Sequence, residues 1–527
     1  MVALALALAA GGAQAVVRRD LGGDVVVAVP AGPAASGPAA VTTLAGAIWT
    51  AAVYDTLYVD RGSAAAPEPL LAAGPPEPLD AVAAGKVWRI PLRPGVFFHD
   101  SAPLDADAVI RSLARLAAPA PAAPHAWLLA PVKGLADVLR GKRDVPSGLR
   151  AESSGAVVVE LVRPSDPVAV ARWLAAPALA ITGAERAGRP PAGTGPFRPA
   201  GEPAAGAPVK LVAFARHARG RPFLDSIVLA PFAARKDALA AFVIGDVQLS
   251  LFGRAVYGSD AAARADAETG AALADVLLLG PARTGRKVLA ASDFRAGVER
   301  AIDRAAVAGF ALGAGALPAA GLVPPVYPFG RIATPAKSDA KSARDLLTGA
   351  AARAGEPLPA LKILLSAARP HHRDVADKLV VALRAAGLDV ELAAEAHAVF
   401  LVRRAAGDYD LCLDEVWLPG GGDLALPGML AALGRGKDAA ALFAAGTHRD
   451  LKTALEVEKR ALGARDGLVL DFRPLRAYAR TGLRGVWFDA AARLHLEDAF
   501  WAAPPRAGAE AAGAGAGAGP AGTGGAK

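Results

Sequence analysis

Short apolar segments separated by turn-forming residues recur along most of the chain, and this pattern predicts a mixed α/β fold. GDVVVAV (23–29) and AVVVELV (156–162) are rich in β-branched residues and predict buried strands. Residues 86–92 alternate polar and apolar, as a half-buried strand does. In residues 44–58, the spacing of apolar side chains predicts a helix.

The segment LRPGVFFHDSAPLDADAVIRSL (92–113) combines several local signals. Arg93-Pro94-Gly95 is typical of a turn, and Val96 to Phe98 predicts a second short strand. Asp105 can accept hydrogen bonds from the first turn of a helix, so we expect a capped helix over residues 104–117.

Residues 361–392 predict a strand–helix–strand unit. LKILLS and LDVEL are strand-like, and HHRDVADKLVVALRAAG between them is helical and ends at Gly387. Such a unit pairs its strands in parallel through a right-handed crossover. Ligands bind beyond the carboxyl ends of such strands, so we expect the loop 367–372 to face a cleft. Further helices are expected at 234–245, 292–308 and 342–353, and a strand at 409–417.

Length and charge narrow the class of protein. A chain of 527 residues that is 53% hydrophobic is too large for one core, so we expect two or three domains. The net charge is +8, but arginines are interspersed with acidic residues and form no basic run with aromatics, so nucleic acid is not an expected partner.

The two ends of the chain suggest export and a tail. Residues 1–15 are apolar and end in Ala13-Gln14-Ala15, which is typical of a signal-peptidase site and predicts a periplasmic location. Residues 504–527 are mostly Gly and Ala and predict a disordered tail.

Few residues suggest catalysis. Cys412, the one cysteine, lies in an apolar strand and is expected to be an inert core thiol. His371 and His372 could touch a metal together with Asp374, but we expect adjacent histidines on a helix or strand to point apart. PAGTGPF (191–197) lacks the lysine of a phosphate-binding loop. The sequence therefore predicts neither an enzyme nor a cofactor or metal site.

A set of ordered segments resembles the family 5 extracellular solute-binding proteins, the dipeptide-, oligopeptide- and nickel-binding receptors of bacterial ABC importers. The resemblance spans residues 24–501 and is most specific over 87–116. Its segments are AAVYDTLYVDRG (51–62), EPLLA (68–72), VWRIPLRPGVFFHDSAPLDADAVIRSLARL (87–116), PAGTGPF (191–197), GRPFLDSIVL (220–229), FRAGVERAIDRAAVAGFALGAGALPAAGLVPP (294–325) and SARDLLTGAAARAG (342–355).

The resemblance implies a type II periplasmic binding protein fold, with two lobes, a hinge and a subdomain inserted in the first lobe. Lobe I would comprise residues 16–280, with the insertion at about 46–185, and lobe II residues 281–480. Residues 481–503 would return to lobe I. The implied function is a monomeric receptor that closes over a peptide or similar small solute and delivers it to the permease subunits of an ABC importer in the inner membrane.

The resemblance also implies ligand-binding residues. Trp417 matches a tryptophan after which the peptide-binding members carry an aspartate for the peptide α-amino group, but Gly420 stands at that position. Asp423 matches a later acidic position, and Asp414 or Glu415 could also substitute from a shifted loop. The remaining candidates are Arg369, for a ligand carboxylate, and Tyr54 and Thr194, whose segments approach the cleft in the family.

Two other functions stay open at this point. The chain could be a non-transport relative, a sensor or scaffold whose cleft is altered or decayed, and the missing aspartate favours some such departure. It could also be a metal-dependent enzyme that uses His371 and His372.

Overall fold

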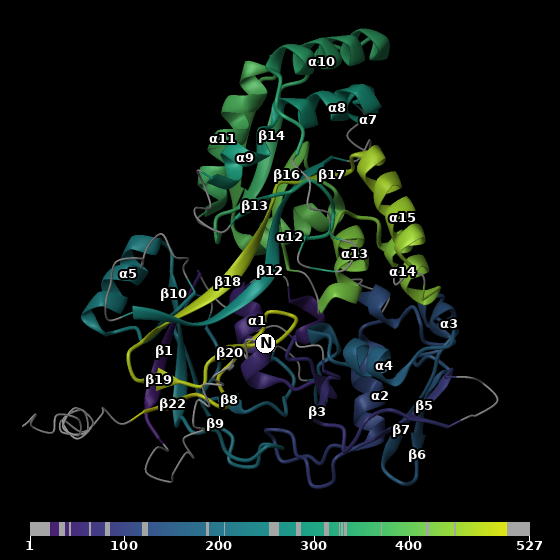
Figure 1. The fold of residues 1–527 in the computed structure, drawn as a ribbon, viewed down its shortest axis with the longest axis vertical. Coiled ribbons are helices and arrows are strands. Elements are labelled where there is room, and N and C mark those ends of the chain that lie inside the picture. Colours follow the sequence, from purple (N-terminus) through teal and green to yellow (C-terminus); the bar gives the residue numbers. More distant parts are fainter. Residues whose placement is uncertain are drawn as a thin grey trace, which may run out of the picture.

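The computed structural model describes most of the chain between residues 22 and 502 (Figure 1). The described residues are 22–30, 37–41, 44–62, 65–79, 85–117, 125–185, 189–204, 206–251, 263–280, 286–309, 316–325, 327, 330, 335–369, 371–417, 421–446 and 450–502. The predicted signal segment 1–15, Gly420 and the predicted tail 504–527 lie outside them.

A 12-stranded mixed sheet runs through the molecule in the order β15-β14-β16-β12-β18-β11-β1-β10-β9-β8, with β13 paired to β18 and β17 to β12. Its lower part contains β1 (Asp24–Pro30), β8 (Phe197–Pro199), β9 (Val209–Ala213), β10 (Ser226–Phe232) and β11 (Leu249–Ser250). Its upper part contains β13 (Leu317–Pro318), β14 (Leu361–Ser366), β15 (Val390–Glu395), β16 (Leu411–Trp417) and β17 (Gly467–Val469).

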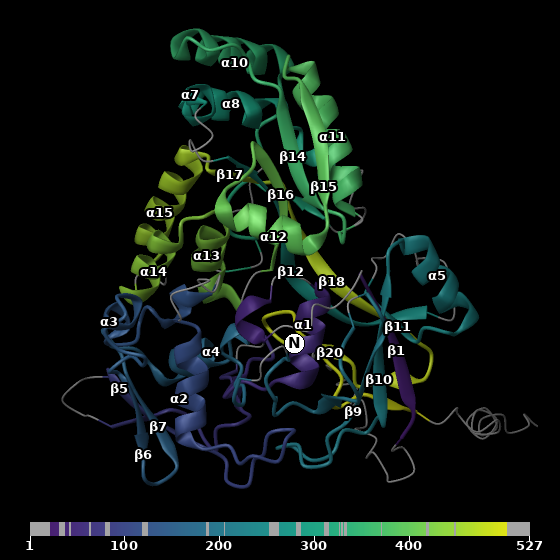
Figure 2. The ribbon, with the colours of Figure 1, turned by 180° about the vertical axis from the view of Figure 1, so that it is seen from behind.

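Two long strands join the parts of this sheet. β12 (Ala263–Leu279) and β18 (Asp471–Arg480) pair antiparallel with several register shifts and pass from one part to the other (Figures 1 and 2). β12 also pairs with β16, and β18 with β11. The predicted lobe boundaries near residues 280 and 480 therefore fall at the ends of these two strands.

Helices cover the upper part of the sheet (Figure 1). They are α7 (Lys287–Ala290), α8 (Ser292–Ala301), α9 (Arg304–Val307), α10 (Ala340–Ala354), α11 (His371–Ala385), α12 (His397–Ala406), α13 (Gly421–Ala432), α14 (Gly436–Ala444) and α15 (Leu451–Ala464). Apolar side chains of α7 to α11 form one core with β14 and β16. Those of α12 to α15 belong to a second core, which is shared with the lower part of the molecule. The predicted parallel pairing of β14 and β15 around α11 is confirmed.

The lower part has two bodies that lie side by side in both views (Figures 1 and 2). The first contains α1 (Leu44–Val53), which packs on β1 and β10, together with α5 (Arg235–Ile244), whereas η2 (Pro38–Ala40) packs on the second. The second surrounds a small sheet and contains β4 (Glu77–Pro78), β5 (Val87–Pro91), β6 (Leu149–Glu152), β7 (Ala156–Glu160), α2 (Ala106–Arg115), α3 (Leu135–Leu139), α4 (Pro167–Leu174), η3 (Ala126–Leu129) and η4 (Pro177–Leu179).

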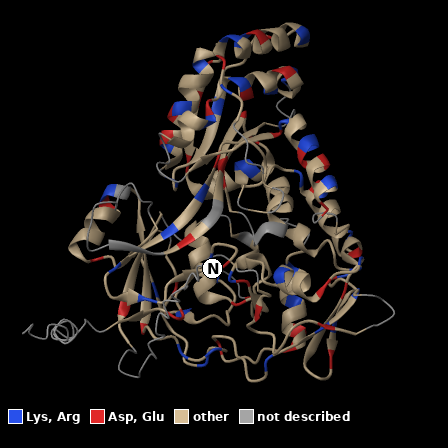
Figure 3. Ribbon diagram, viewed as in Figure 1, with Lys and Arg blue, Asp and Glu red and all other residues tan. Residues whose placement is uncertain are grey.

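Three two-stranded ladders complete the lower part. They are β2 (Tyr58–Val59) with β3 (Glu68–Pro69), β19 (Leu483–Arg484) with β22 (Phe500–Trp501), and β20 (Trp487–Phe488) with β21 (Leu494–His495). Within the described residues, no helix is long and apolar enough to cross a bilayer. Lys and Arg alternate with Asp and Glu on the helices of the upper part (Figure 3).

The segment 92–113 is folded as predicted at its helix and differently at its aromatic residues. Asp105 caps α2 by accepting a hydrogen bond from the Ala108 amide (2.7 Å), as expected. The predicted strand at 96–98 is wrong: only one isolated bridge, Phe97 to Pro103, is present. The reason is a tight turn, in which the Phe98 amide donates to the Ala102 carbonyl.

His99 binds a segment that is distant in the sequence, the 191–197 loop. Its Nε2 lies 2.9 Å from the Gly195 carbonyl, and its backbone amide donates to the Gly193 carbonyl (2.8 Å). Burial lowers the pKa of His99 to about 4, so the neutral ring donates one hydrogen bond to the 191–197 loop.

The predicted helix 292–308 is interrupted. Ile302 is extended, and Asp303 then caps the separate helix α9 by accepting from the Ala306 amide (2.9 Å). An aspartate side chain competes with helix continuation in this way because it satisfies the amides of a new first turn.

Candidate functional site

A cavity of about 760 Å³ lies where the β4–β7 body meets the upper part of the molecule. The lower body contributes η2, α2, η3, η4 and the loop after η4, and the upper part contributes α12, β16 and α13. Its polar lining residues are Ser112, Arg115, His125, Thr182, Glu185, Arg189, Arg404, Asp414 and Glu415. The two sides also share an apolar core, in which Trp127 packs edge-on against Phe443 with ring centroids 5.3 Å apart.

Asp414, a predicted ligand residue on β16, lines this cavity but is held by arginines. Arg369 donates to Oδ1, and Arg404 forms an ion pair with Oδ2. Burial alone would raise the pKa of Asp414, but the charges of Arg404 and Arg369 lower it overall. The carboxylate is therefore ionised and already has two cationic partners.

Arg369, predicted to bind a ligand carboxylate, is itself buried, with 5% of its side chain exposed. It follows β14 in a turn, and its guanidinium also lies over the ring of Phe400, 5.5 Å from the centroid. It contacts the cavity through Asp414 and is absent from the described lining.

Glu415 is paired in a similar way. Its Oε2 accepts from Arg473 Nη2 (3.0 Å) and lies 3.3 Å from His371 Nε2. Burial would raise the pKa of Glu415, but His371 and Arg473 lower it well below its usual range. Asp414 and Glu415, two of the acidic residues that line the cavity, thus both form ion pairs with basic side chains of the protein itself.

Arg115 presents a guanidinium on the opposite wall. It extends from the last turn of α2 and donates to both oxygens of Thr182, while Glu185 lies 3.7 Å away with 80% of its side chain exposed. Ser112 Oγ, one helical turn earlier, lies 3.3 Å from Thr182 Oγ1. Ser112, Arg115 and Thr182 therefore form a polar group that could bind a carboxylate.

Trp417 ends β16 and lines the cavity, as a stacking residue would. Its indole N–H donates to the Ala491 carbonyl (2.7 Å), which fixes the ring. A ligand could therefore meet the face of the ring but not its hydrogen-bond donor.

Tyr54 and Thr194 are buried. The Tyr54 hydroxyl donates to the Pro191 carbonyl (3.0 Å), a residue of the lining, and Thr194 Oγ1 accepts from the Asp55 amide (3.3 Å). Neither belongs to the described lining. Asp423 lies in the first turn of α13, but its side chain lies outside the described part of the chain, as does Gly420. The ligand roles of all six predicted residues stay predictions.

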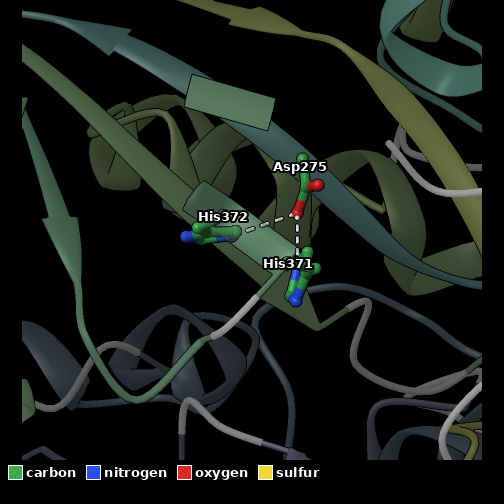
Figure 4. A group of neighbouring side chains, drawn as sticks. All are labelled: Asp275, His371 and His372. Atoms are coloured by element: carbon green, nitrogen blue, oxygen red, sulfur yellow. Dashed lines mark hydrogen bonds and ion pairs between the residues drawn. The ribbon is translucent and has the colours of Figure 1, made fainter. Parts of the chain in front are cut away.

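A second polar group lies behind Glu415. His371 and His372, the first residues of α11, both point to Asp275 on β12 (Figure 4). The expectation that these histidines point apart is wrong, since their ring centroids are 4.5 Å apart. Neighbouring residues on a helix differ by about 100°, not 180°, so one carboxylate at the helix start can reach both rings. These three residues could hold a metal ion.

Sequence reasoning missed most of the cavity lining on the lower side. One local pattern could have drawn attention to Arg115. It is a charged residue in the last turn of a helix whose apolar face is formed by Val109, Leu113 and Leu116. Thr182 and Glu185 lie in irregular backbone, where no periodicity marks them.

The fold and the cavity between its two sides define a two-lobed periplasmic-binding-protein fold, and solved structures support that class. The murein tripeptide binding protein MppA of Escherichia coli matches with a TM-score of 0.76 at 15% identity, covering 91% of this chain and 99% of that one. OppA of Listeria monocytogenes bound to peptide gives 0.76 at 17% identity, with the same coverage. NikA of Staphylococcus aureus in complex with Ni(L-His)2 gives 0.72 at 14% identity, again with 91% and 99% covered.

The family follows from the sequence. The profile described as "Bacterial extracellular solute-binding proteins, family 5 Middle" matches residues 66–430, which is more than half of the chain. The protein therefore belongs to family 5 of the bacterial extracellular solute-binding proteins. A search of curated proteins finds no match.

Proposed function

We propose that this protein is an exported, periplasmic receptor that captures a peptide or similar small solute in the cavity and delivers it to the permease of an ABC importer. The cavity is the observation that carries the proposal. Its volume of about 760 Å³ lies within the range of small-molecule binding sites, and its walls come from the two parts of the molecule that β12 and β18 join. A ligand that contacts both walls stabilises the closed arrangement by its differential affinity for it. The protein acts by binding and not by catalysis.

The lining suggests how a ligand is held. Asp414 and Glu415 are neutralised by Arg369, Arg404 and Arg473, so neither is a ready partner for a peptide ammonium group. Among the described residues, the acidic partner of Arg115 is the exposed Glu185, and this favours a ligand carboxylate at Arg115. Trp417 would stack on the ligand.

The alternative is a non-transport relative, a sensor or scaffold with an altered cleft. It is favoured by the glycine at position 420, where the peptide-binding members carry an aspartate. It is also favoured by the arginine partners that Asp414 and Glu415 of β16 already have. The open volume and polar lining of the cavity favour a protein that still binds a solute.

A binding screen tests the proposal. Thermal shift of the purified chain would be measured against di- to pentapeptides with free and blocked amino termini, small carboxylates, nickel, haem and oligosaccharides. We expect one carboxylate-bearing class to raise the melting temperature. We also expect Arg115→Met to weaken its binding at least tenfold, since a charge-assisted hydrogen bond contributes about 1.5–3 kcal/mol.

The matched control is Arg111→Met, on the same helix but with an exposed side chain outside the lining. This variant should bind as the wild type does. If no class shifts the wild type, the receptor proposal is wrong and the decayed-cleft alternative stands. If Arg111→Met and Arg115→Met behave alike, the assignment of Arg115 is wrong.

A further inference from the structure

Two histidines and an aspartate from different elements meet behind the cavity (Figure 4). Asp275 Oδ1 lies 3.2 Å from His372 Nε2 and 3.5 Å from His371 Nε2. His371 Nε2 lies 3.3 Å from Glu415 Oε2, yet it makes no hydrogen bond of acceptable geometry. This ring nitrogen thus lies within ion-pair distance of two carboxylates and has no well-formed hydrogen bond to either.

These separations match those between ligands of one metal ion. Zinc binds histidine nitrogen at 2.0–2.1 Å and carboxylate oxygen at 2.0–2.2 Å. Atoms at the corners of a tetrahedron of that size lie about 3.3–3.5 Å apart. The Asp275–His371 and Asp275–His372 distances of 3.5 and 3.2 Å lie close to that edge length.

The charges around the cluster are unbalanced within the described residues. Asp275, Glu415 and Asp471 share Arg473, whose nitrogens lie 2.6, 3.0 and 3.1 Å from the three carboxylates. A divalent cation beside Asp275 would offset part of this negative charge.

Unsatisfied polar atoms also gather here. Asp275 Oδ2, Asp471 Oδ2 and His371 Nε2 are buried without a hydrogen-bond partner, and the side chains of Asp275 and His372 are fully buried. Neutral imidazole and ionised carboxylate are the forms that bind metals.

We propose that Asp275, His371 and His372 bind a divalent cation of the zinc class, with Glu415 at its margin. Imidazole with carboxylate suits zinc and its neighbours in the first transition row. Glu415 lines the cavity and His371 is slightly exposed, so the cation has an entry path from the cavity. The site would link α11 to β12, one of the two strands that join the parts of the sheet, and it goes beyond the proposed capture of a solute.

Metal titration of the full chain tests this site. After EDTA treatment and dialysis, Zn(II) would be titrated by calorimetry and Co(II) by visible absorption. We expect one equivalent to bind, with a Co(II) spectrum of low coordination number. His371→Gln should weaken binding at least tenfold, since even outer-shell losses cost about 10–100-fold. Glutamine suits this position because His371 is the partly exposed member of the pair.

His397→Gln is the matched control. His397 begins α12 as His371 begins α11, and its Nδ1 contacts Ser366 Oγ (2.9 Å), outside the cluster. It should bind metal as the wild type does, and circular dichroism should show both variants folded. No binding by the wild type in excess metal would overturn the proposal. Equal affinity in His371→Gln would overturn it as well.

Discussion

At the scale of single residues, the molecule buries charge next to charge, and His495 is the clearest case. Its Nδ1 lies 2.9 Å from Glu497 Oε1, and its Nε2 lies 3.3 Å from Asp489 Oδ2. Its ring also stacks on Trp487 at 4.0 Å. Burial would lower the pKa of His495, but Glu497 and Asp489 raise it to about 9, so the residue is an imidazolium at neutral pH.

This shift predicts a pH dependence of stability. The pKa of His495 is raised above its unfolded value of about 6.5, so its contribution is complete below pH 6.5 and is lost as pH rises to about 9. The size of this pKa shift corresponds to a stabilisation of the folded protein by about 3 kcal/mol. The lowered pKa of Glu497 reflects the same ion pair, so it contributes no separate stabilisation.

Denaturant unfolding of the wild type and His495→Gln, measured from pH 6 to pH 9.5, checks this prediction. The free-energy difference between the two proteins should be largest near pH 6 and shrink toward pH 9.5. A difference that stays constant with pH would show that His495 is not charged in the folded protein.

At the scale of elements, the 191–197 loop depends on glycines that touch another segment. An ideal Cβ at Gly193 would lie 1.8 Å from the Val53 carbonyl oxygen at the end of α1. The Gly195 amide donates to that same carbonyl (2.9 Å), and His99 binds the loop from the other side. The loop, whose Pro191 lines the cavity, is thus held by the end of α1 and by His99.

Gly193→Ala should therefore destabilise the protein by roughly 3 kcal/mol, because overpacking against backbone cannot be relieved by a side-chain rotation. Gly201→Ala is the control, since nothing lies within 4 Å of its Cβ position, and it should change stability by no more than about 0.5 kcal/mol. Thermal unfolding of both variants measures the difference. Equal melting temperatures would mean that the loop does not pack on α1 as described.

Local sequence patterns predicted most helices and strands, but they did not predict contacts between residues that are far apart in the sequence. The strand–helix–strand unit of β14, α11 and β15 and the cap of α2 could be predicted because each signal lies within a few residues of its effect. β12 could not, because ARADAETGAALADVLLL has alanine at many positions and shows no alternation. Gly195 is 96 residues from its partner His99, Asp275 is 96 residues from His371, and no local pattern carries such pairings.

At the scale of the whole molecule, β12 and β18 join two sides that meet again around the cavity. The resemblance of segments 51–62, 87–116 and 191–197 was enough to predict this class of fold, which the family and the solved structures support. It was not enough to predict the cavity chemistry, because the lining comes from side chains at the meeting of α2, α12 and β16. Sequence similarity fixes the class of fold more firmly than the side chains of a site.

The most direct test of solute capture fills the cavity with a side chain. Ala405 is an exposed residue of α12 that lines the cavity, and Ala398 is an exposed residue of the same helix that does not. The measurement is the affinity of Ala405→Trp and Ala398→Trp for whichever solute class shifts the wild type. We predict at least a tenfold loss in Ala405→Trp and wild-type affinity in Ala398→Trp. Wild-type affinity in Ala405→Trp would contradict the account, because the solute would then bind elsewhere.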